Sequence, residues 1–336
     1  MYISGGGFRG WGYLLLYLHQ KKGRHYPISI INGYRAERDE FAKTETLKEI
    51  ARTADRIFRV SDRRRQQVPA VAFLISVLAE SLPHGIKEVC FCQGGVREGI
   101  LFQQLQPVIR RQDPLEVATT PFRTRSADSI GHSLLAAIPP SSTANKFSIP
   151  SALSVHIIQA FANFMYAHAG VSKELASTAA LYSTSTGMLA EVHGISHGDR
   201  TRLALMLQER YGGHLPPREL KAKSAFQDLL SAQERWWIRY IGKLGLVIGI
   251  LYPTGIIDSL WPRVLLSVRW ASDLGKRQDK FGIELTFTAH ATSDHMMIKE
   301  VLERAKRKIE KVGKKKNWIG GRQGWEMKVK VVVNIN

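Results

Sequence analysis

Cysteine is nearly absent from this 336-residue sequence, which contains only Cys90 and Cys92. A secreted protein built on disulfides uses many more cysteines, and a structural zinc site needs four ligands, which this pair alone does not supply. On a β-strand the two side chains would point to the same face, because one residue separates them. The sequence therefore argues against a disulfide scaffold and predicts a reduced, buried pair in an intracellular protein.

Long apolar runs are also missing. The first twelve residues are rich in glycine, where a secretory signal would place a basic segment and then an apolar one. The most apolar stretch, residues 244–257, is shorter than the roughly 20 residues that span a bilayer, and Arg239 and Lys243 precede it. We therefore expect no membrane association, and a cytoplasmic location with the nucleus as a second one.

Acidic residues are scarce: 29 Asp and Glu stand against 48 Lys and Arg, which gives a formal net charge of +19. A basic surface attracts nucleotides, polyphosphate, nucleic acids and acidic proteins, and charge alone does not choose among them or exclude a neutral role. The basic runs are scattered, at residues 63–65, 110–111 and 306–316. No zinc-finger spacing, basic zipper or aromatic RNA-binding signature accompanies them, so we do not expect nucleic-acid binding.

Apolar periodicity predicts an α/β domain at residues 1–110, followed by a linker at residues 111–150. In the α/β domain we predict strands at 2–3, 26–34 and 89–92, and helices at 11–18, 37–53, 69–82 and 96–105. Five prolines with interspersed serine and threonine favour the linker, which short structure at 129–138 interrupts.

Two further domains are predicted after the linker. Residues 151–275 have helical spacing and form an α domain, with helices at 152–169, 174–184, 200–210, 220–251 and 260–274. Residues 276–336 predict a small β-α-β unit, with a strand at 282–289, a helix at 294–312 and a strand at 325–333. The predicted fold class is thus α/β and α, with a β-α-β unit at the carboxy-terminal end.

Two glycine-rich turns lie between a predicted strand and a predicted helix. They read Ser4-Gly5-Gly6-Gly7-Phe8-Arg9-Gly10 and Gln93-Gly94-Gly95-Val96-Arg97-Glu98-Gly99. Glycine permits tight turns, and a helix amino-terminus offers free N–H groups to a phosphate. Glycine also serves such turns for steric reasons alone, so the pattern leaves both interpretations open.

The order of these motifs resembles a known family. The first turn is followed by Tyr26-Pro27, by Gly33-Tyr34-Arg35, and then by Gly95-Val96-Arg97-Glu98-Gly99-Ile100-Leu101. This order is similar to the later half of the actin-like (ribonuclease H-like) ATPase-type domain of the exopolyphosphatase/guanosine pentaphosphate phosphohydrolase (Ppx/GppA) family. Its G-(L/V)-R-E-G-(I/V)-L motif is the most specific match. The resemblance covers about residues 1–110 and implies a partial actin-like domain there.

The resemblance also implies a site for a nucleotide, polyphosphate or other phosphate compound. Carried over residue by residue, the implied ligand-binding residues are Gly5, Gly6, Gly7, Arg9, Gly94, Gly95, Arg97 and Glu98. The glycine backbones would line one wall of the cleft. For Arg97 the alternative is an internal salt bridge with Glu98 or another acid.

Three other stretches, at residues 194–204, 210–213 and 314–321, resemble the fungal retrograde-regulation branch of that family. Members of this branch relay the state of mitochondria to nuclear gene expression through protein partners. The resemblance implies a regulator that senses a nucleotide or phosphate compound and binds proteins of a signalling pathway. A homodimer is a further expectation for its assembly.

The catalytic motifs of the family are not found in this chain. They are a D-x-G-S-x-S loop, a D-x-G-G-G-S loop and a glutamate that activates water, and magnesium-assisted hydrolysis needs such carboxylates. The chain also opens on the last residues of a predicted strand, so we expect it to be the carboxy-terminal part of a longer protein. We predict no catalytic residue, no metal ligand and no cofactor here, with magnesium in a full-length relative. The alternative function is an exopolyphosphatase or nucleotide phosphohydrolase whose catalytic half is missing.

Several histidines are weighed as metal ligands and set aside. Bacterial relatives have an adjacent His-Asp pair, whereas Gly198 separates His197 from Asp199, and His214 stands further along. His193 and His197 have i, i+4 spacing, but Gly194 and Gly198 weaken a helix there. Capping and surface roles are favoured. In the same way, residues 290–295 predict a helix cap through Ser293 or Asp294, and Trp236-Trp237 predicts core packing.

Overall fold

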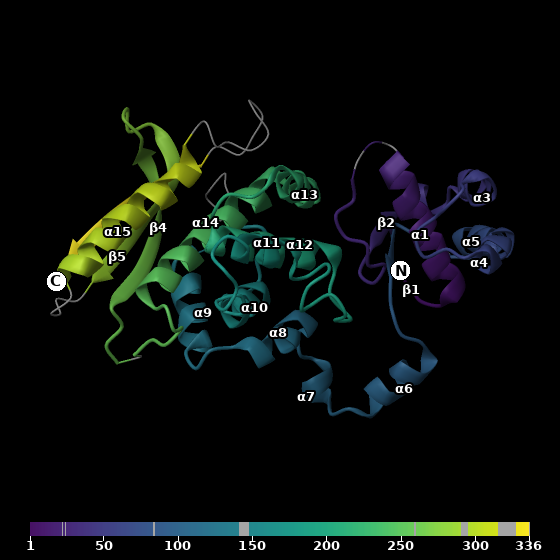
Figure 1. The fold of residues 1–336 in the computed structure, drawn as a ribbon, viewed down its shortest axis with the longest axis horizontal. Helices are drawn as coiled ribbons and strands as arrows, with labels where there is room; N and C mark the ends of the chain where they lie inside the picture. The colour runs from purple at the N-terminus through teal and green to yellow at the C-terminus, as the bar shows by residue number, and fades with distance from the viewer. Residues whose placement is uncertain are drawn as a thin grey trace. The chain divides into compact units, whose positions relative to one another are not determined.

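The computed structural model describes residues 1–21, 23, 25–82, 85–140, 148–258, 260–289, 295–314 and 327–335. The contacts divide the chain into two compact units (Figure 1). Unit 1 comprises Met1–Pro114 and Met188–Arg200, and unit 2 comprises Leu115–Gly187 and Thr201–Asn336. The chain therefore leaves unit 1, builds part of unit 2, returns to unit 1 for a short segment and then completes unit 2.

Unit 1 contains a three-stranded sheet of order β1-β3-β2. β1 (Tyr2–Ile3) runs parallel to β3 (Glu88–Phe91), and β2 (Arg35–Glu37) runs antiparallel to it. The strands predicted at 2–3 and 89–92 are confirmed. The strand predicted at 26–34 is wrong, because these residues form a loop. The loop meets the sheet at its end, where the Gly33 N–H donates to the Phe91 carbonyl at 2.8 Å and the Phe91 N–H donates to the Tyr34 carbonyl at 2.9 Å.

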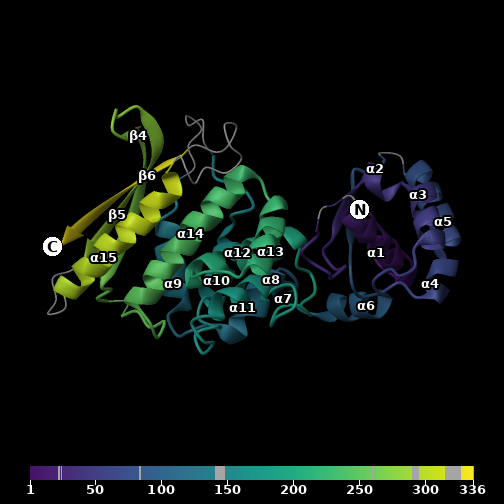
Figure 2. The same cartoon turned by 45° about the horizontal axis from the view of Figure 1, so that its top comes forward.

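Helix α1 (Gly6–Lys21) packs against β3 and is covered by α3 (Thr44–Thr53), α4 (Asp62–Gln66) and α5 (Val68–Ser81), as Figure 2 shows. The predicted helices at 11–18, 69–82 and 96–105 are confirmed as α1, α5 and α6 (Val96–Gln104). The helix predicted at 37–53 is divided by Ala42–Lys43 into α2 (Arg38–Phe41) and α3. The short α7 (Pro107–Arg110) follows α6.

The linker predicted at 111–150 is wrong for most of its length. Residues after Pro114 form α8 (Pro114–Thr119), the 3-10 helix η1 (Thr120–Phe122) and α9 (Ala127–Ala136). Ala127, Ile130 and Leu134 are fully buried in unit 2. Proline misled the prediction because it stands at the start of α8 and η1, where its missing N–H is tolerated.

Four of the five stretches predicted as helices at residues 151–275 are helical in the structure. The helices are α10 (Val155–Phe164), α11 (Ala176–Tyr182), α12 (His197–Tyr211), α13 (Pro217–Asp228) and α14 (Ala232–Leu251). The single helix predicted at 220–251 is two helices. Ser231 caps α14, since its Oγ accepts the Glu234 N–H at 3.2 Å. Trp236 and Trp237 are buried, which confirms their core role.

The helix predicted at 260–274 is wrong. β4 (Val264–Leu274) pairs antiparallel with β5 (Lys280–Ala289), from Val264↔Ala289 to Ala271↔Gly282 and, after an irregularity, Leu274↔Lys280. Adjacent leucines at 265 and 266 also fit helical spacing, but the pairing with β5 decides the conformation.

The predicted β-α-β unit is confirmed. β5, α15 (His295–Glu310) and β6 (Lys328–Ile335) follow one another, and β5 and β6 are parallel. With β4 they form a sheet of order β4-β5-β6, and α15 packs on β5 and β6 (Figures 1 and 2). The predicted cap at 290–294 and most of the resemblance at 314–321 lie outside the described residues.

The chain is therefore a mixed α/β protein, as predicted, while its relation to the actin-like fold stays a prediction. Within the described residues, no helix combines the length and the apolar character needed to cross a membrane.

Candidate functional site

Both predicted glycine turns begin at the same edge of the unit 1 sheet. β1 and β3 are parallel neighbours, with Ile3 opposite Phe91. The Cys92 N–H donates to the Ile3 carbonyl at 2.8 Å, just where the two strands end. Because the carboxyl ends of parallel neighbours meet at one edge, the turns that follow them start side by side. This is the edge at which open α/β sheets commonly bind ligands.

The first turn is tighter than predicted, because α1 begins at Gly6 and takes in Gly6, Gly7 and Arg9. Ser4 and Gly5 form the link, and Gly5 has a φ of +116°, a conformation that glycine adopts far more readily than other residues. Its carbonyl accepts the Arg9 N–H at 3.0 Å, which closes the first helical turn. Gly5 and Gly6 are exposed at this helix start, where the first N–H groups of a helix have no partner within the helix.

Gly6 and Gly7 differ in whether packing requires glycine at their positions. A Cβ added to Gly7 would lie 2.9 Å from Cγ2 of Val71 on α5, whereas one added to Gly6 would meet nothing within 4 Å. Gly7 is thus required for close helix packing, and Gly6 is not. The side-chain Nε of Arg9 is buried and has no hydrogen-bond partner among the described residues.

A small hollow lies beside this turn, between the first turns of α1 and the start of α5. Its volume is about 10 Å³, which is room for about one water molecule. Its polar lining comes from Arg64 and Gln67, and the guanidinium of Arg64 donates to the Arg59 carbonyl at 3.0 Å. A phosphate would therefore sit at the open helix end rather than within this hollow.

The second turn is arranged differently. Gly94 has a φ of +100°, and Gly95 is the residue that precedes α6. The carboxylate of Glu98 accepts the Gly95 N–H at 2.7 Å. Hydrogen bonds from the backbone N–H groups of Glu98 and Gly95 lower the pKa of the Glu98 carboxyl. Glu98 therefore occupies, as a capping anion, the place at which a bound phosphate would accept hydrogen bonds.

Arg97 is exposed on α6 and forms no ion pair within the part of the chain that the structure describes. The proposed internal salt bridge to Glu98 is not formed, since Glu98 turns back to Gly95. The two cysteines next to this turn are free thiols, with Cys90 buried and Cys92 partly buried. Burial, with a smaller contribution from Cys92, raises the pKa of the Cys90 thiol to about 11.

Of the three histidines considered as metal ligands, His193 and His214 are exposed and His197 is buried. α12 begins at His197, so His193 lies before the helix and does not share a face with it. Ser196 caps the same helix, because its Oγ accepts the Asp199 N–H at 3.0 Å and donates to the Asp199 carboxylate at 2.6 Å. Among the described residues no group of three His, Cys, Asp or Glu is placed to hold a metal ion.

His197 instead lies in an aromatic cluster that the sequence did not predict. Its Nδ1 is 2.7 Å from the hydroxyl of Tyr26, and its ring packs against those of Tyr26 and Tyr34. Burial, followed by the positive charge of Arg200, lowers the pKa of His197 to about 3. His197 is therefore a neutral ring that shares a hydrogen bond with the Tyr26 hydroxyl.

The segment Met188–Arg200 closes onto the loop at 26–34, and both belong to unit 1. Gly33 has a φ of +84°, its carbonyl accepts the His197 N–H at 3.2 Å, and an added Cβ would lie 2.1 Å from the Ile195 carbonyl oxygen. The fully buried guanidinium of Arg200 donates to the carbonyls of Leu189 and Val192. The motif at 194–200, which pointed to the fungal branch, thus completes unit 1 rather than the helical domain.

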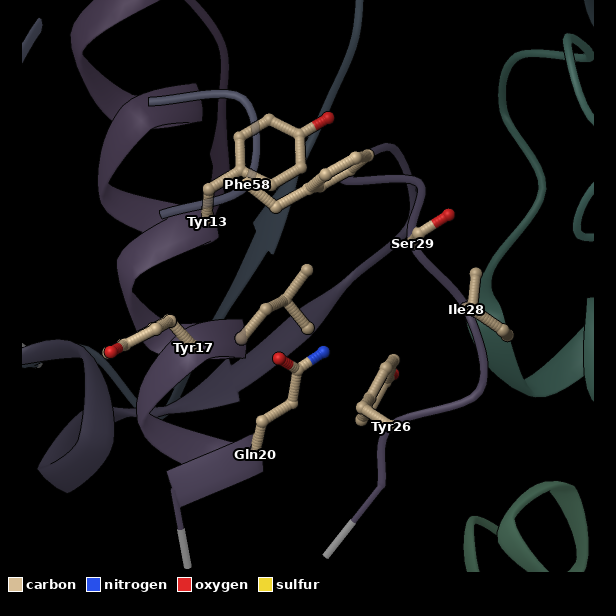
Figure 3. Close-up of a pocket in the computed structure, with 8 residues that line it drawn as sticks. Tyr13, Tyr17, Gln20, Tyr26, Ile28, Ser29 and Phe58 are labelled. Carbon is tan, nitrogen blue, oxygen red and sulfur yellow. The ribbon is translucent and has the colours of Figure 1, made fainter. Parts of the chain in front are cut away.

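A pocket of about 30 Å³ opens near Tyr26 in unit 1, which is space for about two water molecules. Figure 3 shows Tyr13 and Phe58 at one end and Gln20 and Tyr26 at the other. The rings of Tyr13 and Phe58 meet edge to face, with centroids 5.9 Å apart. In this form the pocket is too small for a nucleobase, so it is not the predicted ligand site.

The sequence is similar to known proteins over most of its length. The family model described as the RTG2 C-terminal domain matches residues 113–336. The retrograde regulation protein 2 of Saccharomyces cerevisiae is 36% identical over 272 residues, which cover 76% of this chain and 44% of the yeast protein. The chain thus spans less than half the length of this curated relative.

Proposed function

Because the chain belongs to the retrograde regulation protein 2 family, we propose that it acts in retrograde regulation, the control of nuclear gene expression by the state of mitochondria. The observation that carries this proposal is the 36% identity to the yeast protein over 76% of the chain. In this role the chain works through protein partners in the cytoplasm and nucleus. The family membership itself supports a regulator.

We further propose that unit 1 senses a nucleotide, polyphosphate or another phosphate compound at the first glycine turn. Exposed Gly5 and Gly6, the free N–H groups at the start of α1 and the unpartnered Nε of Arg9 support an anion there. The second turn joins the site once Glu98 releases Gly95, which frees a second set of N–H groups. Arg97, exposed on the same helix, then supplies a positive charge to the ligand.

A chimera tests the regulatory role. In yeast lacking its own retrograde regulation protein 2, the matching region of that protein is replaced by this chain, and transcription of a retrograde reporter is measured after loss of respiration. We expect the chimera to restore induction. A chimera that accumulates to normal levels without restoring it contradicts the proposal.

Titration calorimetry of the purified chain with ATP, guanosine tetraphosphate and polyphosphate tests ligand sensing. We expect Glu98→Gln to bind more tightly than the unsubstituted chain, since its neutral amide competes less well for the Gly95 N–H. Arg9→Gln is expected to bind more weakly. No heat of binding for any of the three compounds would refute the ligand proposal and leave the regulatory one standing.

The alternative function is a phosphoanhydride hydrolase with magnesium as its cofactor. We propose it for a full-length relative and not for this chain. Magnesium-dependent hydrolysis requires carboxylates that hold the metal and activate water. Next to the two turns, the carboxylate of Glu98 is engaged in capping α6. Phosphate release from polyphosphate and guanosine pentaphosphate by the purified chain separates the two candidates, and sustained turnover would establish the hydrolase.

A further inference from the structure

Helix α5 carries apolar residues on two opposite faces. Val68, Ala72 and Ile75 point into unit 1 and are at most 4% exposed. On the other side Phe73, Leu74 and Val77 are 73%, 45% and 40% exposed. Exposed Ala70 extends this outer set to the spacing i, i+3, i+4, i+7. These four residues, the α5 stripe, form one continuous face because that spacing follows the helical turn.

A helix that is apolar on all sides is normally covered on all sides. Burying a phenylalanine side chain is favourable because it removes apolar surface from water, so leaving Phe73 exposed forgoes that stabilisation. The i, i+3, i+4, i+7 pattern is also the one through which helices pack against a partner helix. The geometry thus favours a helical occupant over an extended one.

The arginines that precede α5 favour a partner helix with acidic residues. Residues 52–66, just before α5, contain six arginines and two aspartates. Of these, Arg56, Arg59 and Arg63 are exposed, and none forms an ion pair with a carboxylate among the described residues. Arg63 lies on α4, which packs on α5 and meets it at Gln67. Arg63 therefore places a positive charge, unpaired among the described residues, on the short helix that leads into the amino-terminal end of α5.

We propose that the α5 stripe binds an amphipathic helix of a partner protein, with acidic residues beside its apolar face. The arginines attract the acidic residues, and the apolar faces exclude water from Phe73. A second copy of this chain is a poor occupant because two molecules of charge +19 repel each other. The start of α5 also borders the first glycine turn, but this proposal does not depend on a phosphate bound there.

Three synthetic helical peptides of equal length test the proposal, measured by fluorescence anisotropy with the full chain. The first has an i, i+3, i+4, i+7 apolar face flanked by glutamates, the second replaces the glutamates by lysines, and the third is a scrambled version of the first. We expect the first peptide to bind at least tenfold more tightly than the others. Its affinity is expected to fall as salt is added, since exposed charges are screened.

Matched variants locate the contact. Phe73→Glu is expected to weaken binding of the glutamate peptide at least tenfold, and Arg63→Glu several-fold. Val155→Glu replaces a similarly exposed residue of unit 2 and is expected to leave binding unchanged. Since Phe73 and Arg63 are exposed, all three variants should melt within a few degrees of the unsubstituted chain.

Four results would overturn the proposal. If the lysine peptide binds as tightly as the glutamate peptide, or if no peptide binds, the partner is not an acidic helix. A concentration-dependent dimer that Phe73→Glu dissociates assigns the stripe to a second copy. If the remainder of the yeast relative, expressed separately, slows hydrogen exchange of α5 around Phe73, the stripe is assigned to a contact within one protein.

Discussion

The two units stabilise their polar interiors in different ways. In unit 2 a buried carboxylate, Glu209, is held between Lys223 at 2.6 Å and Lys243 at 2.7 Å. In unit 1 the buried polar groups bind backbone carbonyls or stay neutral, as Arg200 and His197 do. Unit 2 thus depends on matched charges, whereas unit 1 depends on a backbone path that only glycine at position 33 follows.

The largest expected effect is in unit 2. Glu209→Gln leaves two partly buried ammonium groups without their shared anion, and removal of one member of a buried ion pair typically costs about 3–5 kcal/mol. Denaturant unfolding followed by hydrogen exchange would measure the loss in unit 2 separately. Glu300→Gln, which removes an exposed pair with Arg304, is the control and should cost less than about 1 kcal/mol. Equal losses in the two variants would contradict the charge argument.

The next effect is in unit 1. Gly33→Ala forces a left-handed alanine, at about 1–2 kcal/mol, and drives its Cβ against the Ile195 carbonyl, so we expect a total loss of about 3 kcal/mol. Hydrogen exchange should increase first in Met188–Arg200. The control is Gly212→Ala in unit 2, where φ is +64° and the added Cβ meets nothing, so only the conformational cost remains. If both substitutions cost the same, the contact with Ile195 does not matter.

Acid should affect the two units in different pH ranges. His197 is neutral when folded, with its pKa lowered from 6.5 to about 3, so its contribution is complete above about pH 6.5 and is lost as pH falls toward 3. Burial alone would raise the pKa of Glu209, but Lys223 and Lys243 outweigh it and lower the pKa to about 2, so its contribution is lost only between about pH 4.5 and 2.

Hydrogen exchange measured from pH 7 downward should show unit 1 opening first. Tyr26→Phe, which costs about 1 kcal/mol, should leave this order unchanged.

The smallest expected effect is on stability, and it compares Gly6 with Gly7 in the first glycine turn. Gly6→Ala should raise stability by about 0.5 kcal/mol, because the site is open and alanine favours a helix. Gly7→Ala should gain nothing, since its Cβ would press on Val71. Thermal melting measures both. A large loss for Gly6→Ala would show that the backbone of this turn is more constrained than its geometry indicates.

Much of the fold was predictable because its helices have strong local signals. α5, α6 and α10 follow from apolar spacing, and β3 from its short apolar run. β4 was missed because its conformation comes from pairing with β5, a contact that local spacing does not contain. The linker was misassigned because prolines at helix starts resemble those of loops.

The candidate site was predictable only in part. The glycine turns and their shared sheet edge follow from the strand–glycine–helix order. The capping role of Glu98 had a signal, since glutamate three residues after a helix start is common in caps. The contact between His197 and Tyr26 had none, because 171 residues separate the two partners. For the same reason, nothing in residues 188–200 indicated that they complete unit 1.

The divided path of unit 1 has a consequence for its synthesis. Its first part ends at Pro114, and its closing segment ends at Arg200, 86 residues later. At about 5–20 residues per second, the ribosome leaves the aromatic loop around Tyr26 and Tyr34 uncovered for roughly 4–17 seconds. During that interval the rings of Tyr26 and Tyr34 lack His197, the partner against which they pack in the folded unit.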